Sequence, residues 1–391
     1  MLLPRRRLAG LLLASTALCP LPSSPAWAQQ ASVELSELSV EGTRSGVGLS
    51  GAGGNMAISQ DSAATSGGGG GPSGVTGYTA RVSPTATKTN TPLLETPQSV
   101  TVLTREQLND RNVQTLNEAI GYVAGVSSNV FGFDPRFDSF YVRGFSLTYD
   151  GIYRDGLRQI ASGLTVPRIE PYGIEAATIL RGPASGLYGL GSPGGILDVT
   201  TKRPVFTPFG EVQLQVGNFD RYQGNVDIGG PVEGTDGTLA YRVTGIKRQS
   251  DTFLPGGADD RSYIAPAFTW KPSADTTFTV LSEYQETKLP GSTTFFNQNF
   301  RPTRLYSSDP AFNDFKQQQG RVGYAFEHRF DTDLVFRQNF RFYDLSTDYR
   351  YTSISTISPD GLRGCYGPIG RVAQMMGHEP DPKSLPVRCV R

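Results

Sequence analysis

The chain has 391 residues, of which 37% are hydrophobic and 10% aromatic, and its 36 Lys and Arg residues balance 36 Asp and Glu residues. This zero net charge excludes a strongly basic protein overall, so the charge does not favour nucleic acid or anionic lipid as a partner. The 46 glycines, the many Tyr and Phe residues and a mean hydropathy of −0.29 are typical of an all-β protein, either a soluble sandwich or a membrane barrel.

Residues 1–28 have the three parts of a secretory signal peptide. Three arginines at positions 5–7 precede an apolar run over residues 8–18, and Ala-Trp-Ala ends at Ala28. The run is too short to span a bilayer, and Leu18 before Cys19 does not fit a lipoprotein cleavage site. We predict cleavage before Gln29 and a mature chain outside the cytoplasm. No later apolar stretch is long enough for a transmembrane helix.

Residues 29–84 combine a short alternating motif with a long flexible tether. Residues 36–42 alternate polar and apolar side chains, whereas residues 46–84 are rich in Gly, Ser, Ala and Thr and include five consecutive glycines. Such a segment buries too little apolar surface to offset its ordering entropy, and its reach is roughly 30–37 Å. The pattern indicates a strand offered to a partner protein or an ordinary disordered N-terminus.

Residues 85–206 are predicted to form a compact α/β domain. Residues 98–103 alternate as a strand, and Thr104 follows as a helix N-cap with Glu106 in the first turn. Apolar residues between Val113 and Val123 recur at helical spacing, and Gly125 ends that helix. Residues 140–143 and 176–180 favour further strands.

The motif Gly189-Leu190-Gly191-Ser192-Pro193-Gly194 matches the G-x-G-x-x-G pattern of dinucleotide-binding loops. That pattern binds a pyrophosphate only where a strand precedes it and a helix follows it. Here a short, β-branched run follows and ends at Pro204, which favours a strand. We therefore exclude a nucleotide site. No nucleophile and base stand together either, so we expect no enzyme activity.

Residues 207–391 alternate apolar and polar side chains over strands of about ten residues, the length that a tilted transmembrane strand needs. Short connections such as 271–276 alternate with long ones such as 287–316, as periplasmic turns alternate with external loops in outer-membrane barrels. The pattern predicts about seven strands of an antiparallel transmembrane β-barrel. A soluble sandwich is the alternative, although its strands are usually shorter.

Several motifs together resemble the plug domain of TonB-dependent outer-membrane receptors. They lie between Thr85 and Pro204 and read TPQSVTVLTREQL, LNEAIGYVAGV, FYVRGF and ILRGPASGLYGLGSPGGILDVTTKRP. Further on, YRVTGIKRQS, RSYIAPAFTWKP and RQNFRF resemble ferric-hydroxamate (ferrichrome-type) siderophore receptors. The resemblance implies an α/β plug (85–206) inside a barrel (207–391) in a Gram-negative outer membrane. It also implies TonB-dependent uptake of a ferric siderophore.

The resemblance implies a TonB box in the alternating N-terminal motif. An extended segment of this kind adds as a strand to a sheet edge of the energy-transducing protein. No signalling domain fits between the box and the plug. We expect a monomer in outer-membrane lipid, with a TonB-type protein and a ferric siderophore as partners, no nucleic acid and no cofactor. The expected box residues are Glu37, Leu38, Ser39, Val40 and Glu41.

The resemblance also implies the ligand and docking residues. Arg143 and Arg181 belong to an ionic set that docks the plug onto barrel carboxylates. The positions of the family's apical Arg and Tyr are held here by Phe131 and Leu164, which speaks against ferrichrome itself but not against a ferric siderophore. The glycines of the last plug motif permit turns and close backbone contacts. The siderophore-contact candidates are Phe131, Tyr149, Tyr153, Phe295 and Phe296.

Cys365 and Cys389 remain after removal of the signal peptide, in a segment expected to be an external loop. An oxidising compartment makes a disulfide the expected state, and the related receptors carry a Cys pair in a corresponding loop. On chain-entropy grounds the bond would contribute about 3–4 kcal/mol. His328 and His378 form no cluster with these cysteines, so no metal site is expected.

Seven strands cannot close a barrel of this kind, because plugged transporters have about 22 strands. An open sheet edge is not viable in lipid, so we expect this chain to be the N-terminal portion of a longer receptor, with the barrel incomplete. Two other function classes stay open. One is import of another scarce solute, such as cobalamin, haem or a glycan, by the same architecture. The other is a non-transporting secreted β-protein.

Overall fold

The computed structural model describes residues 75–189, 191–298, 301–332, 334–357, 364–374 and 388–390. All described residues belong to one compact unit, which falls within residues 65–391. The predicted signal peptide and the predicted TonB box, Glu37 to Glu41, lie outside the described residues. None of the helices described is long and apolar enough to cross a membrane.

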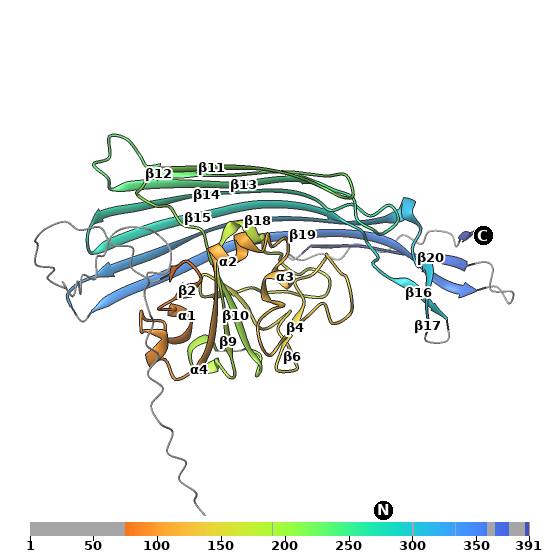
Figure 1. Cartoon of the computed structure of the whole chain (residues 1–391), viewed down its shortest axis with the longest axis horizontal. Coiled ribbons are helices and arrows are strands. Elements are labelled where there is room, and N and C mark those ends of the chain that lie inside the picture. The colour runs from red at the N-terminus through yellow and green to blue at the C-terminus, as the bar shows by residue number, and fades with distance from the viewer. Residues whose placement is uncertain are drawn as a thin grey trace, which may run out of the picture. The chain divides into compact units, whose positions relative to one another are not determined.

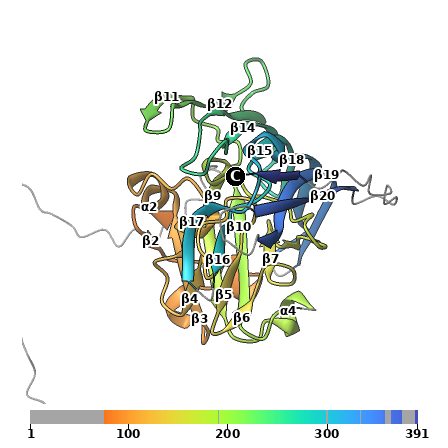
Figure 2. The same ribbon diagram turned by 90° about the vertical axis from the view of Figure 1, so that its right-hand side faces the viewer.

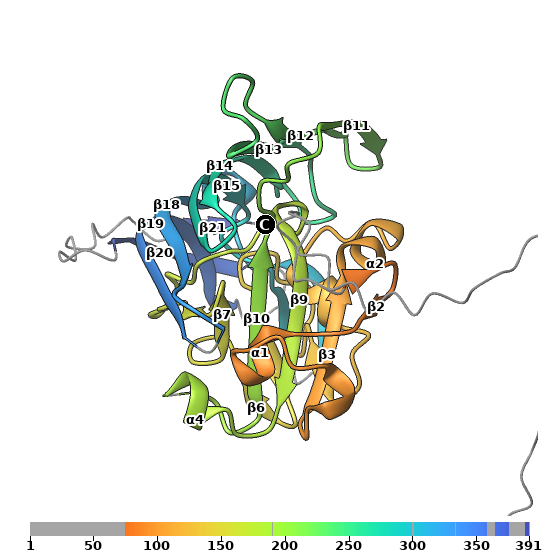
Figure 3. The same cartoon turned by 90° about the vertical axis from the view of Figure 1, so that its left-hand side faces the viewer.

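Residues 75–206, called the α/β region below, are organised around a five-stranded sheet with the order β3-β9-β10-β7-β8 (Figure 3). Strand β7 is parallel to β10, and the other neighbours are antiparallel. A two-stranded sheet (β1-β2) and a three-stranded sheet (β4-β5-β6) accompany it. The strands are β1 (Val75–Thr76), β2 (Thr79–Ala80), β3 (Ser99–Thr104), β4 (Val126–Ser128), β5 (Phe140–Val142), β6 (Phe145–Ser146), β7 (Ile152–Arg154), β8 (Leu157–Arg158), β9 (Ile174–Arg181) and β10 (Gly195–Thr201). The helices are α1 (Pro84–Thr87), α2 (Arg105–Asp110), α3 (Leu116–Ile120), α4 (Ser185–Tyr188) and the 3-10 turns η1 (Leu93–Glu95) and η2 (Pro171–Gly173).

Side-chain caps decide where the two predicted helices begin. Thr104 and Gln107 form a complete capping box at the start of α2, as the sequence pattern predicts. The helical pattern over 113–123 yields only α3, because the Thr115 side chain accepts a hydrogen bond from the Glu118 amide and fixes the helix start at Leu116. The apolar face is nevertheless buried, since Leu116, Ala119, Ile120 and Val123 all belong to one core cluster.

Gly194, the last glycine of the G-x-G-x-x-G motif, and Gly195, which follows the motif, both lie against neighbouring backbone. The motif lies between α4 and β10, so a strand and not a helix follows it, as predicted. Gly195 has φ +138, and a Cβ there would lie 2.1 Å from the carbonyl oxygen of Leu180. A Cβ on Gly194 would lie 2.2 Å from the carbonyl oxygen of Val142. Both positions therefore exclude side chains, because neighbouring backbone occupies the space.

Replacing Gly195 with alanine is expected to destabilise the α/β region by about 3 kcal/mol or more, because the new Cβ meets backbone on β9 at a strained φ. Hydrogen exchange of β9 and β10 measures the effect. Gly186→Ala is the matched control, since a Cβ there has no heavy atom within 4 Å. Equal protection of β9 and β10 in the two variants would contradict the packing role.

The remaining residues form a nine-stranded antiparallel sheet, called the long sheet below, with the order β11-β12-β13-β14-β15-β18-β19-β20-β21 (Figure 1). A separate hairpin, β16-β17, lies between β15 and β18 in the chain (Figure 2). The elements are β11 (Phe209–Gly217), β12 (Arg221–Pro231), β13 (Leu239–Gln249), β14 (Asp260–Ser273), β15 (Thr276–Leu289), β16 (Phe295–Gln298), β17 (Arg301–Tyr306), the 3-10 turn η3 (Pro310–Phe312), β18 (Asn313–Arg329), β19 (Val335–Ile357), β20 (Gly364–Gln374) and β21 (Arg388–Val390).

The long sheet confirms the predicted strands and adds to them. The sequence predicts about seven strands, whereas nine occur among the described residues. The added strands are β20, which carries three glycines and a proline, and β21, which has only three residues. The long loop predicted over 287–316 contains the hairpin β16-β17. Within the described residues the two outer strands, β11 and β21, do not pair with each other, so the sheet is not closed.

The two faces of the long sheet have the opposite polarity to those of a soluble protein. Leu214 on β11 is 85% exposed and Trp270 on β14 is 50% exposed, whereas Asp227 and Gln317 are each 2% exposed. The other exposed apolar side chains on its strands are Val212, Val216, Tyr222, Ile228, Ile264, Phe268, Tyr284, Val322, Phe336, Phe340 and Phe342. An apolar outer face and a polar buried face are what a transmembrane barrel wall requires, so the soluble-sandwich alternative is wrong.

Candidate functional site

Three buried ion pairs join the α/β region to the polar face of the long sheet. Arg154 on β7 pairs with Glu283 on β15. Glu170 pairs with Arg261 on β14 at 2.6 Å, and Lys202 pairs with Asp227 on β12 at 2.6 Å. All six side chains are at most 5% exposed. Buried charges are tolerated only when paired, so each pair fixes the α/β region against the sheet.

A second set of contacts runs from side chains of the sheet to the backbone of the α/β region. Arg341 on β19 donates to the carbonyl oxygens of Arg154 and Leu157, both at 2.9 Å. Gln317 on β18 donates to Val166 at 3.0 Å, and Gln319 donates to the carbonyl oxygen of Arg168 at 2.8 Å. These donors satisfy backbone groups that would otherwise be buried without partners.

Charge is concentrated where these contacts lie. Asp227 accepts from Arg242 at 2.8 Å as well as from Lys202. The pKa of Lys202 is lowered to about 8, mainly because the side chain is buried and also because the positive charge of Arg105 is near. The negative charge of Asp227 acts in the opposite direction and raises this pKa. Burial also raises the pKa of the fully buried Asp138 carboxyl above its usual value. The low dielectric of the interface makes each of these charges sensitive to its neighbours.

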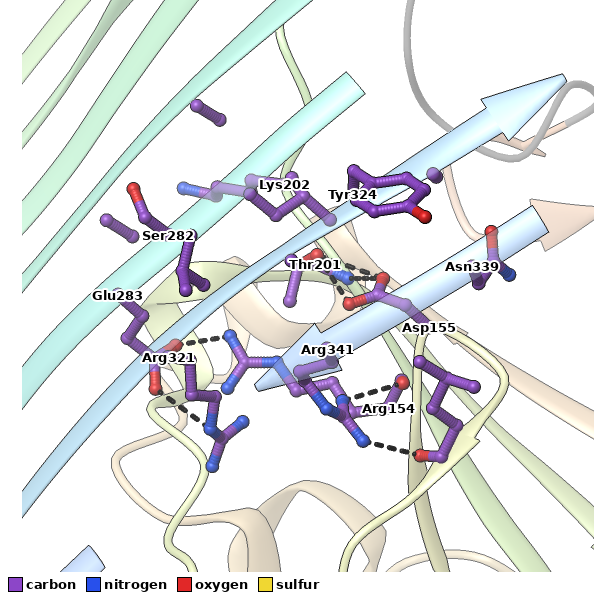
Figure 4. A pocket seen from close by; sticks show the side chains of 18 of the residues that line it. Arg154, Asp155, Thr201, Lys202, Ser282, Glu283, Arg321, Tyr324, Asn339 and Arg341 are labelled. Carbon is purple, nitrogen blue, oxygen red and sulfur yellow. Dashed lines mark hydrogen bonds and ion pairs between the residues drawn. The ribbon is translucent and has the colours of Figure 1, made fainter. Parts of the chain in front are cut away.

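Two cavities lie between the α/β region and the long sheet. The smaller has a volume of about 50 Å³, and its polar lining includes Arg154, Glu283, Arg321 and Arg341 (Figure 4). The larger has a volume of about 580 Å³ and is lined by residues of α1, β10, β14, β15, β18 and β19. Both are lined by Asp155, Ala325 and Asn339, so they are neighbours along the same interface.

Aromatic side chains gather where the loop between β4 and β5 meets the loop between β13 and β14. Phe133 of the first loop contacts Phe253 of the second, with ring centroids 4.8 Å apart. Phe131 contacts Tyr141 at 6.4 Å and is 84% exposed. Exposed aromatic rings on two adjoining loops form a surface suited to an apolar or flat ligand. We call Phe131, Phe133 and Phe253 the aromatic apex.

The structure separates the five residues predicted to contact a siderophore. Phe131 belongs to the aromatic apex, and Tyr149 is 45% exposed with its hydroxyl donating to Gly163 at 3.0 Å. Tyr153 is only 2% exposed, and its ring packs on Tyr188 with centroids 4.8 Å apart. The contact of Tyr153 with a siderophore stays a prediction, and its burial leaves little of the side chain open to a ligand.

Phe295 and Phe296 lie on β16, and neither is fully exposed. Phe295 packs on Tyr306 of the same hairpin, with ring centroids 5.7 Å apart. Within the part of the chain that the structure describes, no ring contact joins these two residues to the aromatic apex. The sequence did not indicate Phe133 or Phe253, although both lie in loops that the strand pattern places at one end of the molecule.

In the part of the chain that the structure describes, neither arginine predicted to dock the plug forms an ion pair with the long sheet. Arg181 donates to Ala124, Ser99 and Thr101, all inside the α/β region. Arg143 is exposed and has a left-handed backbone with φ 51. Among the described residues, docking instead falls to Arg154, Glu170 and Lys202 of the ion pairs above. Their partners on the sheet occupy inward-facing polar positions. The alternation of polar and apolar residues along each strand was the feature of the sequence that could have indicated these positions.

The sheet register brings the two predicted disulfide cysteines opposite each other. Cys365 on β20 and Cys389 on β21 are Cα partners in an antiparallel pair. Directly opposed residues of such a pair have Cα atoms about 4.5–5.5 Å apart, which lies within the range that a disulfide spans.

Comparison with known proteins identifies the α/β region. Residues 92–196 match the family described as TonB-dependent Receptor Plug Domain. The chain therefore carries a plug domain of the TonB-dependent receptors, joined to part of a barrel wall, and the α/β region is that plug. This family comprises transporters and receptors, not enzymes.

Individual relatives agree with this assignment. The chain is 35% identical over 279 residues to the "Ferrichrome outer membrane transporter/phage receptor" of Escherichia coli K12, which covers 68% of this chain and 37% of that protein. It is 34% identical over 273 residues to the "Ferrioxamine receptor" of Yersinia enterocolitica, and the alignment covers 67% of this chain and 38% of that protein. The chain thus spans a little over a third of the length of these relatives.

Solved structures share the fold. The ferripyoverdine receptor of the outer membrane of Pseudomonas aeruginosa superimposes with a TM-score of 0.66 over 76% of this chain and 40% of that chain, at 21% sequence identity. The siderophore receptor PiuA of Acinetobacter baumannii gives a TM-score of 0.65 over 76% and 43%, at 22% identity. At these identities the likeness concerns the fold alone.

Proposed function

We propose that the receptor containing this chain imports a ferric siderophore across the outer membrane of a Gram-negative cell. One observation carries the proposal above all others. The plug is tied by buried ion pairs to the polar face of a sheet whose opposite face is apolar. A soluble protein gains nothing from such an arrangement, whereas a membrane receptor needs the plug to close its lumen.

The proposed mechanism assigns a role to each part of the chain. Residues 1–28 direct export and are removed, and residues 29–84 present the TonB box on a tether. The plug, residues 85–206, closes the wall formed from residues 207–391. A TonB-type protein pairs with the box as an added strand and transmits force to the plug. The force must break the three buried ion pairs before the ligand can pass.

The ligand we propose is a ferric siderophore of the hydroxamate type. Two relatives of this chain are named for ferrichrome and ferrioxamine. The aromatic apex supports a bulky, partly apolar complex, because its three rings are exposed together. Other relatives are named for ferripyoverdine and for a metal–pseudopaline complex, so these chelates belong in the test.

Uptake of radioactive iron tests the proposal in a host that lacks its own siderophore receptors. The host expresses the full-length receptor and is supplied in turn with ferric ferrichrome, ferrioxamine and pyoverdine, and with metal–pseudopaline. We expect TonB-dependent uptake from at least one ferric hydroxamate. Uptake from a non-hydroxamate chelate alone would overturn the ligand class. Import of only cobalamin, haem or a glycan would overturn the siderophore assignment.

Truncating Phe133 to alanine is expected to weaken binding of the imported ferric siderophore about tenfold, because an aromatic contact of this kind contributes about 1.4 kcal/mol. Fluorescence titration of the purified full-length receptor measures the change. Phe330→Ala is the control, since Phe330 is also exposed but lies on the short turn between β18 and β19. An unchanged affinity in the Phe133 variant would show that the ligand binds elsewhere.

We propose that Cys365 and Cys389 form a disulfide, which their register supports. Mass spectrometry of unreduced peptides from the receptor purified from outer membranes should detect the two segments linked. Cys365→Ser should lower the unfolding free energy by about 3–4 kcal/mol, because the unfolded chain gains conformational freedom. Recovery of both peptides as free thiols would contradict the pairing.

A further inference from the structure

The smaller cavity holds more positive than negative charge. Four cationic side chains line it, against the two carboxylates of Asp155 and Glu283. Asp155 is turned aside, since it accepts hydrogen bonds from Thr201, and Arg203 lies 3.9 Å away. The cations are Arg154, Lys202, Arg321 and Arg341. Lys202 is compensated by Asp227, which leaves three guanidinium groups to share Glu283.

The single carboxylate of Glu283 cannot pair with all three guanidinium groups. One of its oxygens pairs with Arg154 (Figure 4). The other accepts a hydrogen bond from Gln319 at 3.2 Å. Arg321 reaches this second oxygen only at 3.8 Å, through its Nε atom. Arg341 is directed away, because its guanidinium donates to backbone carbonyls of the plug. The positive charge of Arg321 is therefore left with a weak partner.

Arg321 is also without hydrogen-bond acceptors. Its side chain is 5% exposed, and among the described residues no atom accepts from its Nε, Nη1 or Nη2. Nη1 of Arg154, which lines the same cavity, has no acceptor in the described part of the chain either. A buried guanidinium presents five N–H donors, and leaving them unsatisfied is costly. The site lacks both an acceptor and a negative charge.

We propose that this cavity binds one small monovalent anion of the chloride type, with Arg321 as its principal donor and Arg154 as the second. A water molecule supplies acceptor lone pairs but no charge, whereas an anion supplies both. The cavity, with a volume of about 50 Å³, has room for a small ion. The anion would reduce the excess positive charge at the point where the plug docks through Arg154.

Bromide substitution tests the site directly. Crystals of the unmodified full-length receptor are soaked in bromide in place of chloride, and the anomalous signal of bromide is located. We expect a peak at hydrogen-bond distance from the Arg321 guanidinium. An ordered water at that position without anomalous signal would overturn the proposal. A peak that persists in Arg321→Gln would mark an adventitious ion and overturn it as well.

Thermal unfolding provides a second test. Replacing gluconate by chloride at constant ionic strength should raise the unfolding midpoint of the unmodified receptor by about 2 °C or more, because the anion binds only the folded state. Arg321→Gln should lose this rise. Arg350→Gln should keep it, since Arg350 is an exposed residue paired with Asp314. A rise of equal size in Arg321→Gln and the unmodified receptor would contradict the assignment.

Discussion

Deleting residues 34–42 from the full-length receptor is expected to abolish siderophore uptake while leaving siderophore affinity unchanged. The deletion removes the proposed TonB box, and strand addition depends on backbone hydrogen bonds along a continuous extended segment. The proposed ligand contacts lie instead on the aromatic apex, in loops of the plug and the wall, which the deletion leaves intact. Loss of uptake to background with an unchanged dissociation constant would separate energy coupling from binding.

The control for this deletion removes nine residues from the Gly/Ser-rich tether, residues 60–68. The tether contributes only reach, which varies slowly with length, so uptake should remain within about a factor of two. Uptake of radioactive iron and a binding titration are measured on all three proteins. Normal uptake after loss of residues 34–42 would show that the box is misplaced.

Replacing Glu283 by glutamine is expected to weaken plug docking by about 3–5 kcal/mol, because it leaves two buried arginines without a carboxylate. Glu283 pairs with Arg154 of the plug and lies 3.8 Å from Arg321 of its own sheet. Hydrogen exchange at β7 and β8 should accelerate, and the outer membrane should become more permeable to large antibiotics, because the plug detaches more often from the wall.

The matched control is Glu327→Gln, on the strand next to that of Glu283. Glu327 pairs with Arg337, and both side chains are close to half exposed. An exposed pair contributes about 0–1 kcal/mol, so exchange at β7 should hardly change. Equal exchange rates in the two variants would show that the buried pair does not hold the plug.

Short sequence patterns predicted the helices and strands that are determined by neighbouring residues in the chain. The period-two alternation after Phe206 indicated the long sheet and which residues face outward, and the Thr104 capping box indicated the start of α2. The strands that escaped prediction lack that signal. Strand β20 carries glycines and a proline, and β21 is too short to show a period.

The docking contacts could not be predicted because they join distant parts of the chain. Arg154 and Glu283 are 129 positions apart, and nothing in either local sequence selects the other as its partner. The resemblance to the receptor family suggested Arg143 and Arg181, and the described contacts fall elsewhere. The burial of all three residues of β7, Tyr153 included, likewise depends on distant parts of the chain and not on the local pattern.

In the proposed receptor, the apolar face of the long sheet contacts lipid and the polar face contacts the plug. Single spin labels on the full-length receptor in a lipid bilayer test this directly, through collision rates with molecular oxygen, which concentrates in the hydrocarbon. Labels at Val322 and Phe340, on the apolar face, should show high oxygen accessibility, and labels at Gln319 and Thr347, on the polar face, should show low accessibility. High accessibility at Gln319 and Thr347 with protection at Val322 and Phe340 would contradict it.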